Sequence, residues 1–120
     1  MGFDNTLYMK KRKLAENKNT PKDVLRKLAK NINASIRDLV ASHSNTPKDA
    51  LLHLATDRNA LVRHNVAKNC TSSSKILAVL FQYERSFEEP DKYVIGALYY
   101  NKKLPYVAKK IIETLYGDML

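Results

Sequence analysis

The chain has 120 residues, of which 44% are hydrophobic and 28% are charged, and its formal net charge is +9 at pH 7. This length suits one domain with a modest core, and the composition is ordinary for a globular protein. The sequence has no apolar run near the roughly 20 residues that cross a bilayer, and its N-terminus lacks the apolar core of a secretory signal. We therefore expect a cytoplasmic protein without a membrane span.

Residue types that commonly carry chemistry are few. Cys70 is the single cysteine, which excludes an intrachain disulfide, a four-cysteine zinc site and an all-cysteine iron–sulfur cluster. The histidines at positions 43, 53 and 64 fall at different registers of the repeat described below. No spacing indicates a nucleophile with its base or a glycine-rich phosphate loop. We predict no catalytic residue, no bound metal and no cofactor.

One segment of the chain occurs twice. The run Asn19–Leu25 (NTPKDVL) returns 26 residues later as Asn45–Leu51 (NTPKDAL). The same register relates Ile36-Arg37 to Val62-Arg63. Self-similarity at such a period is typical of stacked helical units, because each unit buries its apolar face against the next. The sequence therefore predicts an all-α solenoid of three to four units of about 26 residues.

We expect a single domain, residues 1–120, whose parts follow this register. They are a degenerate N-terminal helix (6–17), a first unit (18–43), a second unit (44–69), a third unit (70–100) with an insertion at 82–92, and a C-terminal capping helix (101–117).

Polar residues mark where the predicted helices begin. Thr20 is expected to cap the first helix of unit one, with Pro21 at the first helical position and Asp23 completing a capping box. Ser72 stands in the place of Thr20 in the third unit and can also cap a helix. Ser86 predicts the start of the next helix, after the insertion begins.

An arginine occupies the same position in two successive units. Asp57 precedes Arg63 by six residues, and Arg37 occupies the matching place in the previous unit. A carboxylate at a turn and a guanidinium one element later are well placed to pair between stacked units. We therefore interpret Asp57, Arg37 and Arg63 as structural residues.

The outer side of the predicted array becomes apolar along the chain. Arg26-Lys27 in the first unit is replaced by Leu52-His53 in the second and by Ala78-Val79 in the third. An apolar outer face needs cover. Either the C-terminal residues fold over it, or it is an interface for a partner or a second copy.

The repeated pattern resembles a known family. The run Asn-Thr-Pro-x-x-Val-Leu-x-x-Leu-Ala, followed by Val-Arg-x-x-Val-Ala, is similar to the variant leucine-rich repeat (LRV) family, a relative of HEAT repeats, over about residues 14–81. The resemblance implies a right-handed superhelix in which α-helices alternate with short 3₁₀-like or α turns. Some members carry a cysteine-ligated iron–sulfur module, which the lone Cys70 excludes here. The family shares no catalytic residues, so the resemblance implies a shape and not an activity.

The leading functional prediction is a non-enzymatic binding module that acts as a protein–protein interaction scaffold. Two surfaces are candidates for docking the partner protein. One is the apolar outer face around Leu52, Ala78 and Val79, and the other is the inner ridge of second helices around His64, Asn65, Lys68 and Tyr100.

The alternative prediction is nucleic-acid binding through phosphate contacts. Residues 1–30 hold nine Lys and Arg against three Asp and Glu, which is +6 of the net +9. Such an asymmetry suggests an anionic partner. The alternative is a solvated end of the array, because terminal repeats are often strongly polar. The candidate contacts are Lys10, Lys11, Arg12, Lys13, Lys18, Lys22, Arg26, Lys27 and Lys30. The sequence leaves the oligomeric state open.

Overall fold

A computed structural model describes residues 6–120, and over that range the protein is all-helical with no β-strand, which confirms the all-α prediction. No helix within this range has the length and apolar character that a bilayer span requires. The elements are α1 (Thr6–Glu16), α2 (Lys22–Leu28), α3 (Ala34–Ser42), α4 (Lys48–Leu54), α5 (Ala60–Lys68), α6 (Ser74–Arg85), α7 (Lys92–Tyr99), α8 (Tyr106–Tyr116) and the 3₁₀ helix η1 (Gly117–Met119).

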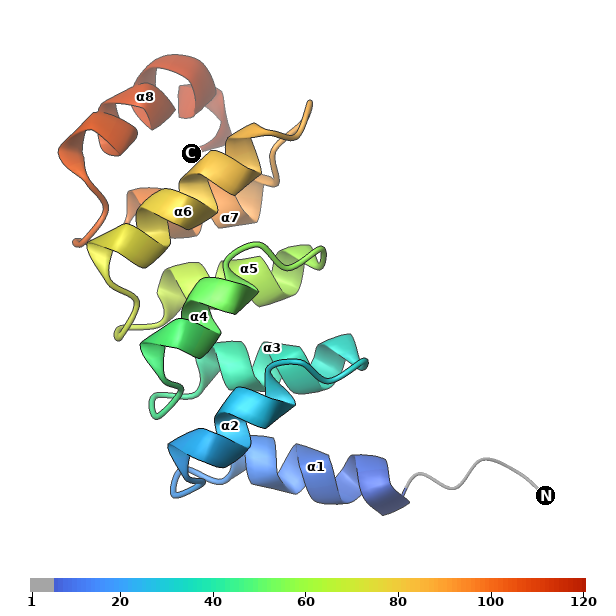
Figure 1. Cartoon of the computed structure of the whole chain (residues 1–120). Coiled ribbons are helices and arrows are strands. Elements are labelled where there is room, and N and C mark those ends of the chain that lie inside the picture. The colour runs from blue at the N-terminus through green and yellow to red at the C-terminus, as the bar shows by residue number, and fades with distance from the viewer. Residues whose placement is uncertain (1–5) are drawn as a thin grey trace.

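The helices form two rows. Helices α1, α3, α5 and α7 contact one another in that order, and we call them the odd row. Helices α2, α4 and α6 form the even row, in which α2 contacts α4 and α4 contacts α6 (Figure 1). Helix α8 packs on α7 at the C-terminal end. The result is an elongated molecule of 53 × 30 × 18 Å.

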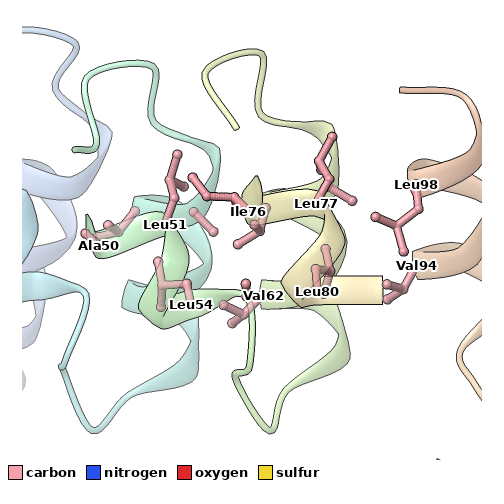
Figure 2. Packing of buried hydrophobic residues seen from close by; sticks show 14 of the residues in the cluster. Ala50, Leu51, Leu54, Val62, Ile76, Leu77, Leu80, Val94 and Leu98 are labelled. Atoms are coloured by element: carbon pink, nitrogen blue, oxygen red, sulfur yellow. The ribbon is translucent and has the colours of Figure 1, made fainter. Parts of the chain in front are cut away.

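The core lies between the two rows. Leu25, Leu51 and Leu77 stand at equivalent positions of the even row, and each is fully buried. In Figure 2, Leu51 and Leu54 of α4 lie beside Ile76 of α6, while Leu77 faces α7. Burying one such side chain contributes about 1.5–3 kcal/mol. The equivalent positions of the odd row are filled by Ile36, Val62 and Val94, which are also fully buried.

The predicted cap at Thr20 is wrong. The residue before α2 is Pro21, and no side chain caps this helix. The hydroxyls of Thr20, Thr46 and Ser72 donate instead to the carbonyl oxygens of Leu14, Val40 and Val66, each six residues earlier. These carbonyls lie in the last turns of helices, where backbone partners are few, and those of Val40 and Val66 also accept the backbone N–H groups of His43 and Asn69. The hydroxyls therefore close the preceding helix, and Ser73 caps α6 in place of Ser72.

Helix α7 begins later than the sequence predicted. Helix α6 continues to Arg85, and Ser86 is the residue at its C-terminal end. The cap of α7 is Asp91, whose Oδ1 accepts hydrogen bonds from the backbone N–H groups of Tyr93 and Val94 at 2.8 and 3.1 Å. A carboxylate also favours a helix N-terminus through the helix dipole, an advantage that Ser86 lacks.

The two recurring arginines join successive units, but with different partners from those that the spacing suggested. Nε of Arg37 donates to Oδ2 of Asp57 at 2.7 Å, and Nε of Arg63 donates to Oε1 of Glu84 at 2.8 Å. Arg63 reaches only the backbone carbonyl of Asp57, at 2.9 Å. In each arginine, Nη1 donates to backbone carbonyl oxygen in the turn before its own helix. Nε and Nη2 donate to the carboxylate of the next unit.

The outer apolar positions are partly covered within the even row itself. Leu52, Ala78 and Val79 are half-buried, and Leu52 and Val79 pack against the core. In Figure 1, α6 lies between α4 and α8, so α8 does not cover α4. The apolar outer surface is therefore smaller than the sequence indicated.

Candidate binding groove

A groove runs between α5 and α7 on the exposed side of the odd row. Two adjoining cavities form it, and His64 lines both. The first has a volume of about 400 Å³ and includes Lys68, Gly96 and Tyr100 among its walls. The second has a volume of about 330 Å³ and includes Leu61 and Tyr93. We call this the α5–α7 groove and define it by Leu61, His64, Lys68, Tyr93, Gly96 and Tyr100.

The repeat register explains why the groove opens at this place. Asp38, His64 and Gly96 occupy equivalent positions of α3, α5 and α7. Between α3 and α5 the space is bridged, because the Asp38 carboxylate accepts a hydrogen bond from the amide of Asn65. Burial is the main cause that raises the pKa of Asp38. In α7 the matching residues are Gly96 and Ala97, which carry no side chain long enough to reach α5.

The fold does not require a glycine at position 96. No glycine among the described residues has a positive φ, so its backbone conformation suits any residue. A Cβ atom placed on Gly96 would meet no other atom within 4 Å, so packing does not exclude a side chain either. A glycine inside a helix destabilises it by about 0.5–1 kcal/mol relative to alanine. This destabilising glycine lies in the wall of the α5–α7 groove.

We predict that Gly96→Ala raises the free energy of unfolding by about 0.5–1 kcal/mol, because the added methyl group restricts the unfolded chain and meets nothing in the folded one. Urea unfolding followed by circular dichroism measures the change. Gly117→Ala is the comparison, since Gly117 also has free space around its Cβ but lies beyond the end of α8. A destabilised Gly96→Ala protein would show that the helix does need glycine there.

Tyrosines flank Gly96 on the surface of α7. Tyr93 and Tyr100 are 65% and 71% exposed, three residues before and four residues after Gly96, so they lie on the same side of the helix. The Tyr100 ring stands edge-on to Tyr99, with ring centroids 5.0 Å apart. Tyr99 in turn donates a hydrogen bond to Glu113 of α8, which raises the pKa of Tyr99 and lowers that of Glu113. Tyr100 is therefore exposed but held in place.

His64 and Lys68 supply the polar groups of the groove from the α5 side. Nδ1 of His64 is buried, and it has no hydrogen-bond partner within the described part of the chain. Such an atom costs about 1–3 kcal/mol until a partner is found. Lys68 is exposed and takes part in none of the ion pairs between described residues. Lys68 is therefore open to a ligand, whereas Nδ1 of His64 is unpaired but covered.

The structure brings together most of the inner ridge that the sequence singled out. His64, Lys68 and Tyr100 border the groove, whereas Asn65 turns toward Asp38. Sequence reasoning missed Gly96 and Tyr93 as groove residues. A glycine in the middle of a helix, in register with His64, is the signal that would have revealed the opening.

The basic residues of the N-terminal end differ in what they contact. Arg12 pairs with Glu16 at 3.3 Å, and Arg26 pairs with Asp23 and Asp49 at 2.9 and 2.8 Å. Lys22 contacts the side-chain oxygen of Asn45 at 3.2 Å, and Lys11 is half-buried. Lys18 and Lys30 line two different cavities. The remaining members of the set, Lys10, Lys13 and Lys27, are exposed.

Comparison with known proteins identifies no relative: no protein-family model matches the chain, and neither a curated protein nor a solved structure matches it significantly.

Proposed function

We propose that the chain is a short helical-repeat solenoid of the variant leucine-rich type and that it acts as a non-catalytic module that binds a partner protein in the α5–α7 groove. The groove with its two exposed tyrosines, Tyr93 and Tyr100, on either side of Gly96 is the observation that carries this proposal. Tyrosine is among the residues that contribute most to protein–protein binding, because its ring buries much area at a small cost in conformational entropy.

The repeated register supports the solenoid. Equivalent core leucines at 25, 51 and 77, and equivalent hydroxyls at 20, 46 and 72, make similar contacts in each unit. Stacked units of this kind present an extended surface built from one helix per unit, and such surfaces commonly bind proteins. The α5–α7 groove lies on that surface.

A protein partner fits the surface better than a nucleic acid does. Phosphate binding needs cations that are free to contact the backbone of the nucleic acid. Here three of the nine candidate contacts are engaged within the chain, because Arg12 and Arg26 hold carboxylates and Lys22 contacts Asn45. Exposed tyrosines beside a groove are instead typical of a surface that buries a protein segment.

A peptide library tests the proposal. A random library of 12-residue peptides displayed on phage is selected against the wild-type chain, Gly96→Leu and Gly117→Leu. The leucine at position 96 fills the groove, and because a Cβ there meets nothing within 4 Å we expect the fold to persist. Leucine at position 117 adds the same side chain where a Cβ also has free space, but away from the groove. Thermal unfolding by circular dichroism checks all three folds.

We expect peptides selected by the wild-type chain to bind Gly117→Leu equally well and to bind Gly96→Leu at least about tenfold more weakly, the loss that a blocked central contact produces. Peptides that bind all three proteins with equal affinity would contradict the proposal. A selection that enriches no peptide on the wild-type chain would contradict it as well.

A further inference from the structure

The two ends of the α5–α7 groove differ in chemistry, and this difference points to the kind of ligand. Resting on the function proposed above, we infer that the groove binds an extended segment of a partner protein that carries an aliphatic side chain and, about three residues away, an acidic side chain. The aliphatic side chain lies between Leu61 and Tyr93, and the acidic one reaches Lys68 beside Tyr100.

The aliphatic end is lined mainly by carbon. Leu61 is 55% exposed and faces the same cavity as Ala60 and Tyr93. The polar residues of this cavity are His64 and Asp91. The Asp91 carboxylate is engaged with the first N–H groups of α7, and its negative charge disfavours a second carboxylate at this end. An uncharged aliphatic side chain is the group that fits here.

The other end is cationic. Lys68 lines the first cavity with Tyr100 and Asn101, and its ammonium group is in no ion pair between described residues. The amide of Asn101 is occupied, because it donates to the carbonyl oxygen of Ala67 at 2.8 Å. The chain as a whole carries a charge of +9, which attracts an acidic segment from a distance. An acidic side chain therefore complements this end.

The separation of the two ends sets the spacing in the ligand. Leu61 and Lys68 are seven residues apart on α5, which corresponds to about 10 Å along a helix that rises 1.5 Å per residue. An extended chain rises about 3.3 Å per residue, so it covers this distance in about three residues. The groove therefore selects an aliphatic residue at position i and an acidic residue near i+3.

An extended segment suits the groove better than a helix. The axes of packed helices such as α5 and α7 lie about 8–10 Å apart, whereas a helix with its side chains is about 10–12 Å across. A bare backbone is thinner and can approach the floor at Gly96, where no side chain stands. His64 lines both cavities, so it lies beside the path of such a segment.

Defined peptides test the ligand class. The probes are acetylated, amidated Gly-Ser peptides that contain one leucine and one glutamate separated by one to six positions, with glutamine or lysine replacing glutamate as controls. Binding to the full chain is measured from amide chemical shifts during titration. We expect the tightest binding when glutamate is three positions from leucine, in one chain direction, and a loss of about two- to fivefold with glutamine, as for an exposed ion pair.

Reversing the charge at position 68 tests whether Lys68 contacts the acidic side chain of the peptide. Lys68→Glu is expected to weaken the best glutamate peptide by about tenfold and to improve binding of the matching lysine peptide. Lys75→Glu is the matched control, because it makes the same change in net charge on the exposed surface of α6, in the even row. Equal losses in the two variants would show that only the overall charge matters and would overturn the inference.

The two proposals fail in different ways. If library peptides depend on Gly96, but spacing and Lys68 have no effect on the defined peptides, the ligand class is wrong and the proposed function stands. If no peptide distinguishes the wild-type chain from Gly96→Leu, both are wrong.

Discussion

Glu84→Ala is expected to lower the free energy of unfolding by about 3–5 kcal/mol, the usual cost of removing one partner from a buried ion pair. Glu84 is fully buried, and its Oε1 accepts a hydrogen bond from Nε of Arg63 at 2.8 Å. Its Oε2 accepts the backbone N–H of Asp91, also at 2.8 Å. The substitution leaves the guanidinium of Arg63, itself 4% exposed, without a countercharge. Urea unfolding measures the loss.

Asp49→Ala is the control for this prediction. Asp49 also pairs with an arginine of the preceding unit, since its carboxylate contacts Nε of Arg26 at 2.8 Å, but both side chains are largely exposed. Solvent screens such a pair, so its removal should cost far less than the removal of Glu84. Similar losses in the two variants would contradict the interpretation that burial gives the Arg63–Glu84 pair its importance.

Leu51→Ala is expected to cost about 2–5 kcal/mol, because it opens a cavity between the rows. Leu51 belongs to the duplicated segment, is fully buried and lies against α6 in Figure 2. Leu52→Ala removes the same atoms from the next residue, which is only half-buried, and should cost clearly less. The difference in urea midpoint between the two variants checks the prediction. Equal midpoints would show that the register of the buried face is incorrectly assigned.

The helices of the duplicated segments could be predicted from the sequence because their signals are local. An apolar stripe at helical spacing fixes which side of α2 and α4 is buried, and the duplication repeats the assignment. The direction of the Thr20 hydroxyl could not be predicted in this way. A hydroxyl at a turn can serve an N–H of the following helix or a carbonyl of the preceding one, and only the path of the turn decides which it contacts.

The partner of Arg63 was missed because it lies outside the repeat. Arg37 pairs with Asp57, 20 residues later, in a turn of the next unit. Glu84, 21 residues after Arg63, belongs to the extended end of α6, where the third unit departs from the register. A periodic argument cannot anticipate a residue in an insertion. Its burial depends on the loop that folds over it, in which Asp91 contributes an N–H group.

The groove could be predicted in part. The surface positions of the second helices follow from the register, and this placed His64, Lys68 and Tyr100 on one ridge. The depth of the groove depends on what α7 lacks, namely a side chain at Gly96 opposite His64. The opening lies between two helices that are distant in sequence. A lone glycine within a helical pattern does not by itself indicate that a groove forms beside it.

The most direct test of the groove is to map a library-selected peptide on the full chain by backbone amide chemical shifts. We predict that the largest shifts occur at His64, Lys68, Tyr93, Gly96 and Tyr100 and that they disappear in Gly96→Leu. Shifts centred instead on the basic helix α1, or on the exposed apolar side of α8 at Val107 and Leu115, would contradict the account.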